Sequence, residues 1–294
     1  MEKTKKVKVK KYNLMKKTPA EYVLYSIVFA IFCFFAASYV YMLFWCFYSG
    51  TRAADIVVTD PFGFSKPNFG NYIEVFRIMD ANGAGFLEML LNSMYFSIFG
   101  CAISIMVTTM FAYVCNKYTF PGAKLIYSII IVMMTLPIYG SGSGMYKLLY
   151  NLKLLNSPLM LLTSIGGFNM HFLYIYAFFS GVSWNYGEAA QIDGANDWQI
   201  FFKIMFPQAI AMVGSLYVLM WLGEWNSYGT ALIYLPKMPT LAVGIYQFQQ
   251  QMQYESRYDI LYAACAISII PPLVLFTLCN SALMSNISLG GIKE

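Results

Sequence analysis

Residues Met89–Asn116 read MLLNSMYFSIFGCAISIMVTTMFAYVCN, without one charged side chain. The apolar residues run continuously and do not alternate with polar ones, which favours an α-helix over a strand of a β-barrel. An α-helix needs about 20 residues to cross about 30 Å of hydrocarbon. This stretch is therefore predicted to cross a membrane as one helix.

Similar uncharged stretches occur along the rest of the chain. They are Tyr22–Thr51, Leu125–Tyr146, Leu154–Gly187, Ile204–Gly223 and Ile260–Ile292. With 59% hydrophobic and 11% charged residues, the composition excludes a soluble domain of this length. We predict an all-α polytopic membrane protein with six transmembrane helices. The domain covers residues 21–284, with spans at about 22–48, 90–115, 124–146, 156–182, 207–226 and 260–284.

The basic residues predict how the chain is oriented in the membrane. Eight lysines lie in the tail formed by residues 1–20, and the positive-inside rule keeps such a cluster in the cytoplasm. An even number of spans returns the second tail, residues 285–294, to the same side. Twelve basic residues then lie inside and seven outside. The first span is longer than the apolar region of a signal peptide and lacks a small-residue cleavage site, which predicts a retained anchor.

Signatures of a catalytic or metal-binding site are missing from the sequence. The cysteines have no paired metal-ligand spacing, and His171 is the only histidine. Packing is the simpler role for these side chains. No phosphate-binding loop follows the consensus G-x-x-x-x-G-K-[ST], so we expect no enzyme activity and no bound cofactor. A nucleic-acid partner for the lysine cluster is disfavoured, because topogenic and lipid-surface roles explain the lysines more simply.

A polar segment, residues 185–206, interrupts the apolar pattern and is predicted to face the cytoplasm. Asn185 and Glu188 have the spacing of a capping box, which predicts a short helix from Asn185. Gly194 is placed to end that helix in the left-handed conformation. Ala189, Ala190 and Ile192 are expected to form its small apolar side.

The second half of the polar segment predicts another helix. Asn196 or Asp197 can cap it, and Pro207 marks a bend or helix start at the membrane surface. We expect four apolar residues to share one face of this helix: Trp198, Phe201, Phe202 and Met205. The segment is thus predicted to form a helix-turn-helix elbow, or, on composition alone, an amphipathic connector lying on the membrane.

The polar segment resembles the cytoplasmic signature of membrane subunits of binding-protein-dependent ABC importers. That signature is Glu-Ala-Ala, three residues, Gly, nine residues and Ile-x-Leu-Pro. The matching residues are Glu188, Ala189, Ala190, Gly194, Ile204 and Pro207, and Phe206 replaces the leucine. The surrounding residues, including Asp193 and Ala195, are similar to the form found in carbohydrate importers. Patches at Asn71-Tyr72, Asn92-Ser93, Phe120-Pro121-Gly122 and Trp225-Asn226 extend the resemblance to the smaller membrane subunit of the maltose transporter.

The resemblance implies partners and a mechanism for this chain. The elbow would be a coupling helix that docks into a cytoplasmic ATPase subunit, with Glu188 making polar contacts and Gly194 forming the turn. ATP and Mg²⁺ would bind to two ATPase subunits, and a second permease and an external binding protein would complete the importer. The tail residues Gly290, Gly291 and Lys293 would also reach the ATPases, although Asn286 stands where a glycine is common.

Residues of the translocation path are predicted from polarity within or near the spans. They are Asn92, Ser93, Glu224, Trp225 and Asn226. An ionised acid within the membrane is costly, so Glu224 should face water, a partner or the path. Serine and threonine in spans more often pack or form hydrogen bonds between helices.

Three alternatives remain beside a sugar importer subunit in a bacterial or archaeal cytoplasmic membrane. The first is the same machinery importing another solute. The second is a secondary transporter or channel, which calls for ion-coupling acids within the spans, whereas almost all acids of this chain lie in loops. The third is a membrane scaffold with a docking loop and no path.

Overall fold

The computed structural model describes residues 19–136, 142–166 and 169–287, and these residues are almost entirely helical. Four of their helices are long and apolar enough to cross a membrane: Pro19–Ser49, Phe86–Lys117, Asp197–Asn226 and Tyr258–Cys279. A shorter apolar helix covers Ala123–Thr135. The all-α membrane fold is therefore confirmed, while the number of six spans stays a prediction.

The elements follow one another in a simple order along the chain. The first part contains α1 (Pro19–Ser49), α2 (Ala54–Thr59), α3 (Gly70–Ile78), the two-residue strands β1 (Asp80–Ala81) and β2 (Ala84–Gly85), and α4 (Phe86–Lys117). The middle contains α5 (Ala123–Thr135), α6 (Gly142–Asn151), the 3₁₀ helix η1 (Pro158–Gly166), α7 (Met170–Gly181), α8 (Asn185–Ile192), α9 (Asp197–Ile200) and the π-helical turn η2 (Phe201–Met205). The last part contains α10 (Phe206–Asn226), α11 (Gly229–Tyr234), α12 (Leu241–Glu255) and α13 (Tyr258–Ile287).

The third and fourth predicted spans differ in form from the other four. The third window contains α5 and the start of α6, and residues 137–141 between them lie outside the described part. The fourth window contains η1 and α7, separated by residues 167–168, which also lie outside it. A 3₁₀ helix rises about 2.0 Å per residue, so η1 is more extended than an α-helix of the same length.

Helix α4 is the centre of the bundle and contacts α7, η1, α10 and α12. Its buried face carries a row of small residues: Ser93, Ser97, Gly100, Cys101, Ser104, Thr108 and Ala112. Small residues at such spacing let neighbouring helices approach closely in a membrane. The hydroxyls of Thr108 and Thr109 donate to carbonyls one turn back in the same helix, at 2.7 and 2.6 Å. These two hydroxyls are thus satisfied within α4, which is common for threonine within a span.

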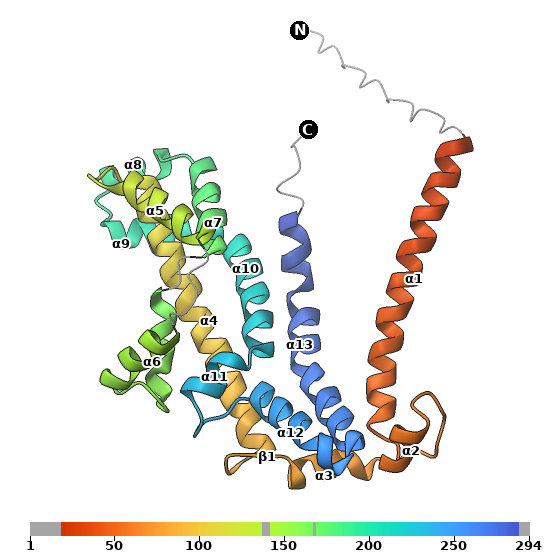
Figure 1. Cartoon of the computed structure of the whole chain (residues 1–294). Coiled ribbons are helices and arrows are strands. Elements are labelled where there is room, and N and C mark those ends of the chain that lie inside the picture. Colours follow the sequence, from red (N-terminus) through yellow and green to blue (C-terminus); the bar gives the residue numbers. More distant parts are fainter. Residues whose placement is uncertain (1–18, 137–141, 167–168, 288–294) are drawn as a thin grey trace.

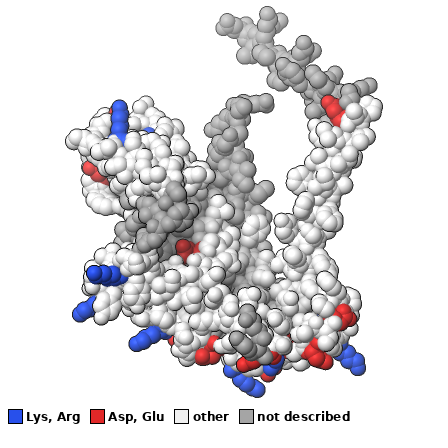
Figure 2. Space-filling view, in the orientation of Figure 1, with Lys and Arg blue, Asp and Glu red and all other residues white. Residues whose placement is uncertain are grey.

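The two ends of the molecule have different architectures (Figure 1). One end carries the N-terminal end of α1, the C-terminal end of α13, and helices α8 and α9. The opposite end carries α2, α3, the strands and α12. Charged side chains gather at the ends, and the visible face between them is nearly free of charge (Figure 2). We call the end with α8 and α9 the elbow end and the opposite end the platform end.

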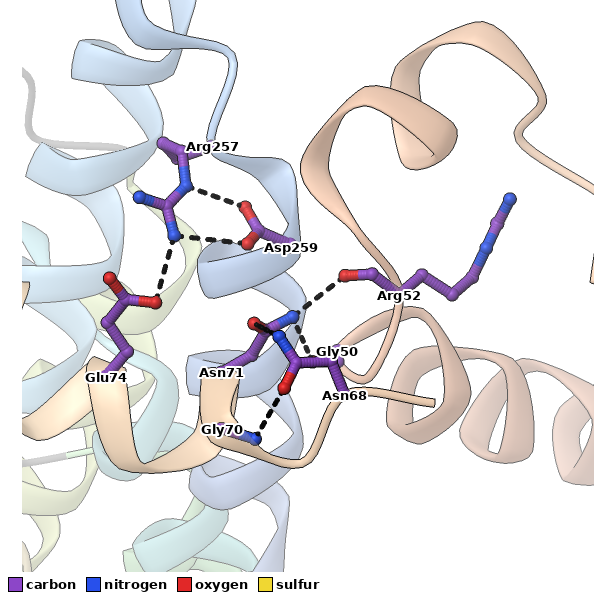
Figure 3. Close-up of polar contacts among 8 residues, drawn as sticks. All are labelled: Gly50, Arg52, Asn68, Gly70, Asn71, Glu74, Arg257 and Asp259. Carbon is purple, nitrogen blue, oxygen red and sulfur yellow. Dashed lines mark hydrogen bonds and ion pairs between the residues drawn. The ribbon is translucent and has the colours of Figure 1, made fainter. Parts of the chain in front are cut away.

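Polar contacts hold the platform end together (Figure 3). Asn71 Nδ2 donates to the carbonyls of Gly50 and Arg52 at 3.1 and 2.8 Å. Arg257 forms ion pairs with Glu74 and with Asp259 at 3.2 and 3.1 Å. These contacts join α3 both to the end of α1 and to the start of α13.

The end of α1 also approaches α13 closely. A Cβ atom at Gly50 would lie 2.8 Å from Ala263 Cα, closer than such atoms pack. Only glycine fits at this crossing without a shift of the backbone. By contrast, the most apolar part of α1 buries none of its residues against the described part of the chain.

Arg52 is completely buried at the platform end and binds main-chain atoms. Its guanidinium donates to the carbonyls of Pro61 at 2.8 Å, Ile56 at 3.3 Å and Asp60. It also lies over the rings of Trp45 and Tyr48, at 5.7 and 6.0 Å from the ring centroids. One arginine thus fixes the conformation of the segment that follows α1.

Candidate coupling elbow and path residues

The elbow consists of α8, a turn at residues 193–196, α9 and η2, and it leads directly into α10. Helix α8 begins at Asn185, as predicted, and Asp193 is its C-cap. Pro207 is the second residue of α10 and follows directly after the π-helical turn η2, with which α10 is continuous. The predicted helix-turn-helix is therefore present in the structure.

Gly194 forms the turn of the elbow, with φ at +82°. The Gly194 N–H donates to Gln191 O at 3.0 Å, and the Ala195 N–H donates to Ala190 O at 2.9 Å. This pair of bonds is the Schellman motif, which satisfies carbonyls at the end of a helix. The left-handed end of α8 at Gly194 is thus confirmed.

The predicted capping box at Asn185 and Glu188 is wrong. Trp184 is the N-cap of α8 and makes no side-chain cap, and the Asn185 N–H donates to Ser183 Oγ at 3.3 Å. A capping box is present at the start of α9, where Asn196 Oδ1 accepts from the Gln199 N–H at 2.9 Å. Gln199 Oε1 in turn accepts from the Asn196 N–H at 3.0 Å. Asn196, and not Asp197, is therefore the cap of the second helix.

The four apolar residues of the second helix do not share one face. Phe201 and Met205 are buried, whereas Trp198 and Phe202 are exposed and stack on each other with centroids 6.0 Å apart. The reason is η2, whose π-helical turn contains an extra residue and shifts the register of the side chains. A spacing argument based on a regular α-helix cannot predict this shift.

The outward surface of α8 is apolar at its tip. Ile192 is 87% exposed, the highest value of any large hydrophobic residue described. Glu188 and Ala189 are exposed beside it, and Tyr186 is 57% exposed. Ala190 is 8% exposed and faces inward, so only Ala189 of the two alanines is available to a partner. Ile192, Ala189 and Glu188 thus form the exposed surface at the tip of α8.

The inner surface of the elbow packs against the end of α4. The Tyr113 ring contacts the rings of Phe201 and Phe179, with centroids 5.0 and 5.5 Å away. The Tyr118 hydroxyl donates to Asp197 Oδ1 at 2.8 Å, and the Tyr118 ring contacts that of Trp184 at 5.7 Å. Ala195 and Ile204 are partly buried against the same cluster. The sequence did not indicate a role for either tyrosine, because hydropathy cannot distinguish an aromatic residue that packs against the elbow from any other aromatic residue.

The hydrogen bond from Tyr118 to Asp197 holds over the physiological pH range. Burial, together with hydrogen bonds to Tyr113 and Asp197, raises the pKa of the Tyr118 hydroxyl above its ordinary value. The hydroxyl therefore stays protonated at neutral pH and keeps donating. The elbow is thus attached to α4 by ring packing and by the hydrogen bond from Tyr118 to Asp197.

The structure places the predicted path residues Asn92 and Ser93 in a structural role. Asn92 Nδ2 donates to Pro239 O at 3.1 Å. The buried Ser93 hydroxyl accepts from the Leu241 N–H at 2.7 Å. Leu241 is the first residue of α12, and its N-cap Thr240 forms no side-chain cap. Ser93 thus caps α12 from a different helix.

Substitution of Ser93 by alanine is expected to loosen the start of α12. An N-cap hydrogen bond contributes about 1 kcal/mol, which corresponds to roughly fivefold faster exchange of the first amides of α12. Hydrogen exchange by mass spectrometry on Ser93→Ala measures this effect. Ser97→Ala is a matched control, because Ser97 is buried one turn away and its hydroxyl has no partner among the described residues. Equal exchange in the two variants would contradict the capping role.

Glu224 and Ser93 line one small cavity of about 90 Å³. It lies between α4, η1, α10 and α11. Its hydroxyl-bearing residues are Ser93, Ser97, Thr163, Ser164, Ser227, Thr230 and Thr240. Within the described part of the chain, Glu224 is its only charged lining residue. The cavity is therefore polar and weakly acidic, with room for a few water molecules.

Trp225 and Asn226 lie outside this cavity. The Trp225 ring is 5% exposed, and its Nε1 donates to Ser268 O at 3.2 Å. Asn226 Nδ2 donates to Leu222 O, one turn back, at 2.8 Å. Both residues line a second opening, a groove of about 280 Å³. Ser93 and Glu224 thus line one space and Trp225 and Asn226 line another, whereas Asn92 lines neither.

The remaining candidates from the sequence are the residues of the C-terminal tail and His171. Gly290, Gly291 and Lys293 of the C-terminal tail lie outside the described residues. His171 Nδ1 lies 2.9 Å from Asn169 Oδ1 at the start of α7. No group of three or more His, Cys, Asp or Glu side chains suited to a metal ion occurs within residues 19–136, 142–166 and 169–287.

Fold and elbow together define a polytopic helical membrane component with a helix-turn-helix elbow at one end. Residues 104–288 match the family described as binding-protein-dependent transport system inner membrane component. The chain belongs to this family of ABC transporter permease subunits, which are non-catalytic. Membrane localisation follows from the family and from the apolar helices.

Curated relatives include permeases of carbohydrate uptake systems. The chain is 28% identical over 258 residues to a diacetylchitobiose uptake system permease of Streptomyces coelicolor, which covers 85% of this chain and 82% of that protein. It is 24% identical over 269 residues to a galactooligosaccharides transport system permease of Bacillus subtilis, covering 90% and 94%. It is 25% identical to the arabinooligosaccharides permease of the same organism, covering 77% and 79%.

A solved structure shares the fold. It is the crystal structure of a bacterial ABC transporter involved in the import of the acidic polysaccharide alginate. One chain of it matches with a TM-score of 0.73 at 19% identity, covering 90% of this chain and 98% of that one. At this identity the match supports the architecture alone.

Proposed function

We propose that this chain is one of two permease subunits of an importer for a sugar or oligosaccharide. A second permease completes the path as a heterodimer, and an extracytoplasmic binding protein delivers the solute at the platform end. Two ATPase subunits bind ATP and Mg²⁺ and drive the cycle at the elbow end. This chain binds no cofactor itself. It has six spans, both termini are cytoplasmic, and the host is a bacterium or an archaeon.

The observation that carries this proposal is Ile192 at the tip of α8. Its side chain is 87% exposed beside the exposed Glu188 and Ala189 of the importer signature, which leaves this surface of α8 accessible to a partner. Behind it, the elbow packs rigidly against α4 through Tyr113 and Tyr118 and continues into α10. A push on α8 is therefore transmitted to two long helices as a rigid-body motion. The carbohydrate relatives support a sugar as the solute.

Substitution of Ile192 by glutamate tests the coupling role. Burial of an isoleucine side chain contributes about 1.5–3 kcal/mol, so docking of the ATPase is expected to weaken roughly 10- to 100-fold. ATPase activity stimulated by the binding protein is measured on the reconstituted importer. Ile192→Leu is the control and should keep that stimulation, since it preserves the apolar volume. Unchanged stimulation in Ile192→Glu would remove Ile192 from the docking surface.

A further inference from the structure

The groove beside Trp225 and Asn226 has the chemistry of a ligand site. It has a volume of about 280 Å³ and opens between α10, α12 and α13 at the platform end. Ligand pockets for whole small molecules measure about 300–1,000 Å³. The groove therefore suits one ring of a larger ligand that extends beyond it.

Two tyrosines supply an apolar platform in this groove. The rings of Tyr228 and Tyr246 are stacked, with centroids 4.4 Å apart and planes inclined by 12°. Tyr228 is 43% exposed, so its ring offers contact area to a ligand. Aromatic faces bind C–H surfaces, and the tyrosine hydroxyl adds a polar group at the edge.

Amide and hydroxyl groups surround the tyrosine pair. Gln249 is exposed and has no hydrogen-bond partner among the described residues, so its amide is free both to donate and to accept. Asn226 uses its amide N–H on Leu222 O, which leaves Oδ1 as an acceptor. Ser268 donates to Cys265 O at 2.8 Å and can still accept. An aromatic face bordered by paired donors and acceptors matches a sugar ring, which is apolar on its faces and carries hydroxyls on its rim.

The charge of the residues that line the groove indicates which class of sugar it can bind. No charged side chain lines the groove among the residues that the structure describes. A uronate would find no cation among the described lining residues of the groove, whereas neutral hydroxyls or N-acetyl groups need none.

We propose that this groove is a carbohydrate subsite of the subunit and binds one ring of a neutral oligosaccharide. The inference rests on the proposed import of a carbohydrate and names its class. Tyr228 provides the stacking face. Gln249 and Asn226 hydrogen-bond the hydroxyls of the bound ring.

Saturation-transfer NMR on the complete transporter in nanodiscs, without binding protein, tests the subsite. The probes are N,N′-diacetylchitobiose, arabinobiose, galactobiose and the anionic digalacturonate. At least one neutral disaccharide is expected to bind, and digalacturonate is not. Tyr228→Ala and Gln249→Ala should each weaken binding about tenfold, the effect of one lost contact. Tyr228→Phe keeps the stacking face and should bind like the unaltered protein. Gln251→Ala is the second control, because Gln251 is exposed on α12 and does not line the groove.

The result is read beside binding-protein-stimulated ATPase activity of the same preparations. Normal stimulation with unchanged binding in Tyr228→Ala and Gln249→Ala overturns the subsite and leaves the importer assignment in place. Preferred binding of digalacturonate, or binding of no neutral probe, overturns the neutral class of ligand. Absence of stimulation in the unaltered transporter counts against the proposed function itself.

Discussion

Gly194→Val is expected to abolish ATP-driven uptake, whereas Gly194→Asn should retain most of it. Gly194 has φ at +82° in the turn between α8 and α9. A residue with a Cβ costs roughly 1–2 kcal/mol in the left-handed region, and a β-branched valine costs more. Asparagine is tolerated there, because its short polar side chain can hydrogen-bond locally.

The open space around Gly194 means that the valine and asparagine variants can be compared without a steric clash. A Cβ at this position meets no atom within 4 Å, so the two variants differ in backbone strain and not in steric clash. Strain would release the Schellman bonds to Ala190 and Gln191 and let α8 rotate relative to α9. Uptake of labelled sugar into proteoliposomes is the measurement, with co-purification of the second permease as the check of assembly. Equal uptake by both variants would show that the turn geometry is irrelevant to coupling.

Arg52→Met is expected to destabilise the platform end by about 3 kcal/mol or more. Hydrogen bonds from a charged group contribute roughly 1.5–3 kcal/mol each, and a carbonyl left without a donor in the interior adds a further cost. Methionine fills a similar volume but donates to none of the three carbonyls that Arg52 binds, those of Pro61, Ile56 and Asp60. The segment between α1 and α3 should therefore become accessible to protease.

The control for this variant is Arg77→Met at the end of α3. Arg77 is exposed and has no ion pair within the part of the chain that the structure describes. Exposed charges of this kind change stability by less than about 0.5 kcal/mol. Limited proteolysis and the midpoint of thermal unfolding of the purified complex compare the two variants. Similar midpoints would mean that the segment after α1 is held by other contacts.

The long helices could be predicted from the sequence, because hydropathy over 20 residues reports the solvent directly. Helices α1, α4, α10 and α13 each contain one predicted span. The same signal does not resolve breaks within an apolar window. Hydropathy predicted one helix over residues 156–182, where the structure has the 3₁₀ helix η1 and the α-helix α7.

The elbow shows both the strength and the limit of local patterns. Gly194 was predicted correctly, since only a few residue types tolerate a positive φ. Asn185 and Asn196 each stand three residues before a Glu or Gln and so carry the same capping signal. The structure uses only Asn196, because Asn196 is the N-cap of α9, whereas Trp184 is the N-cap of α8 and Asn185 is already its first helical residue. A shift of one residue in where a helix begins is not encoded in either pattern.

Contacts between distant residues could not be predicted. Tyr118 is 79 positions from Asp197 in the chain, and Ser93 is 148 positions from Leu241. Tyr228 is the N-cap of α11, and Tyr246 lies in α12. Neither residue stands in a recognisable motif. Such pairs depend on how the helices pack, which hydropathy and spacing do not report.

The cap that Ser93 provides for α12 has a consequence for the order in which the protein is made. Ser93 is synthesised long before Leu241. The Ser93 hydroxyl in α4 therefore cannot accept the Leu241 N–H until the later helices have been inserted. Short helices are marginal without tertiary support, and the 15 residues of α12 start with no cap of their own. Helix α12 should therefore take its final form only after α4 and α10 have met, which makes the platform end one of the last parts of the chain to mature.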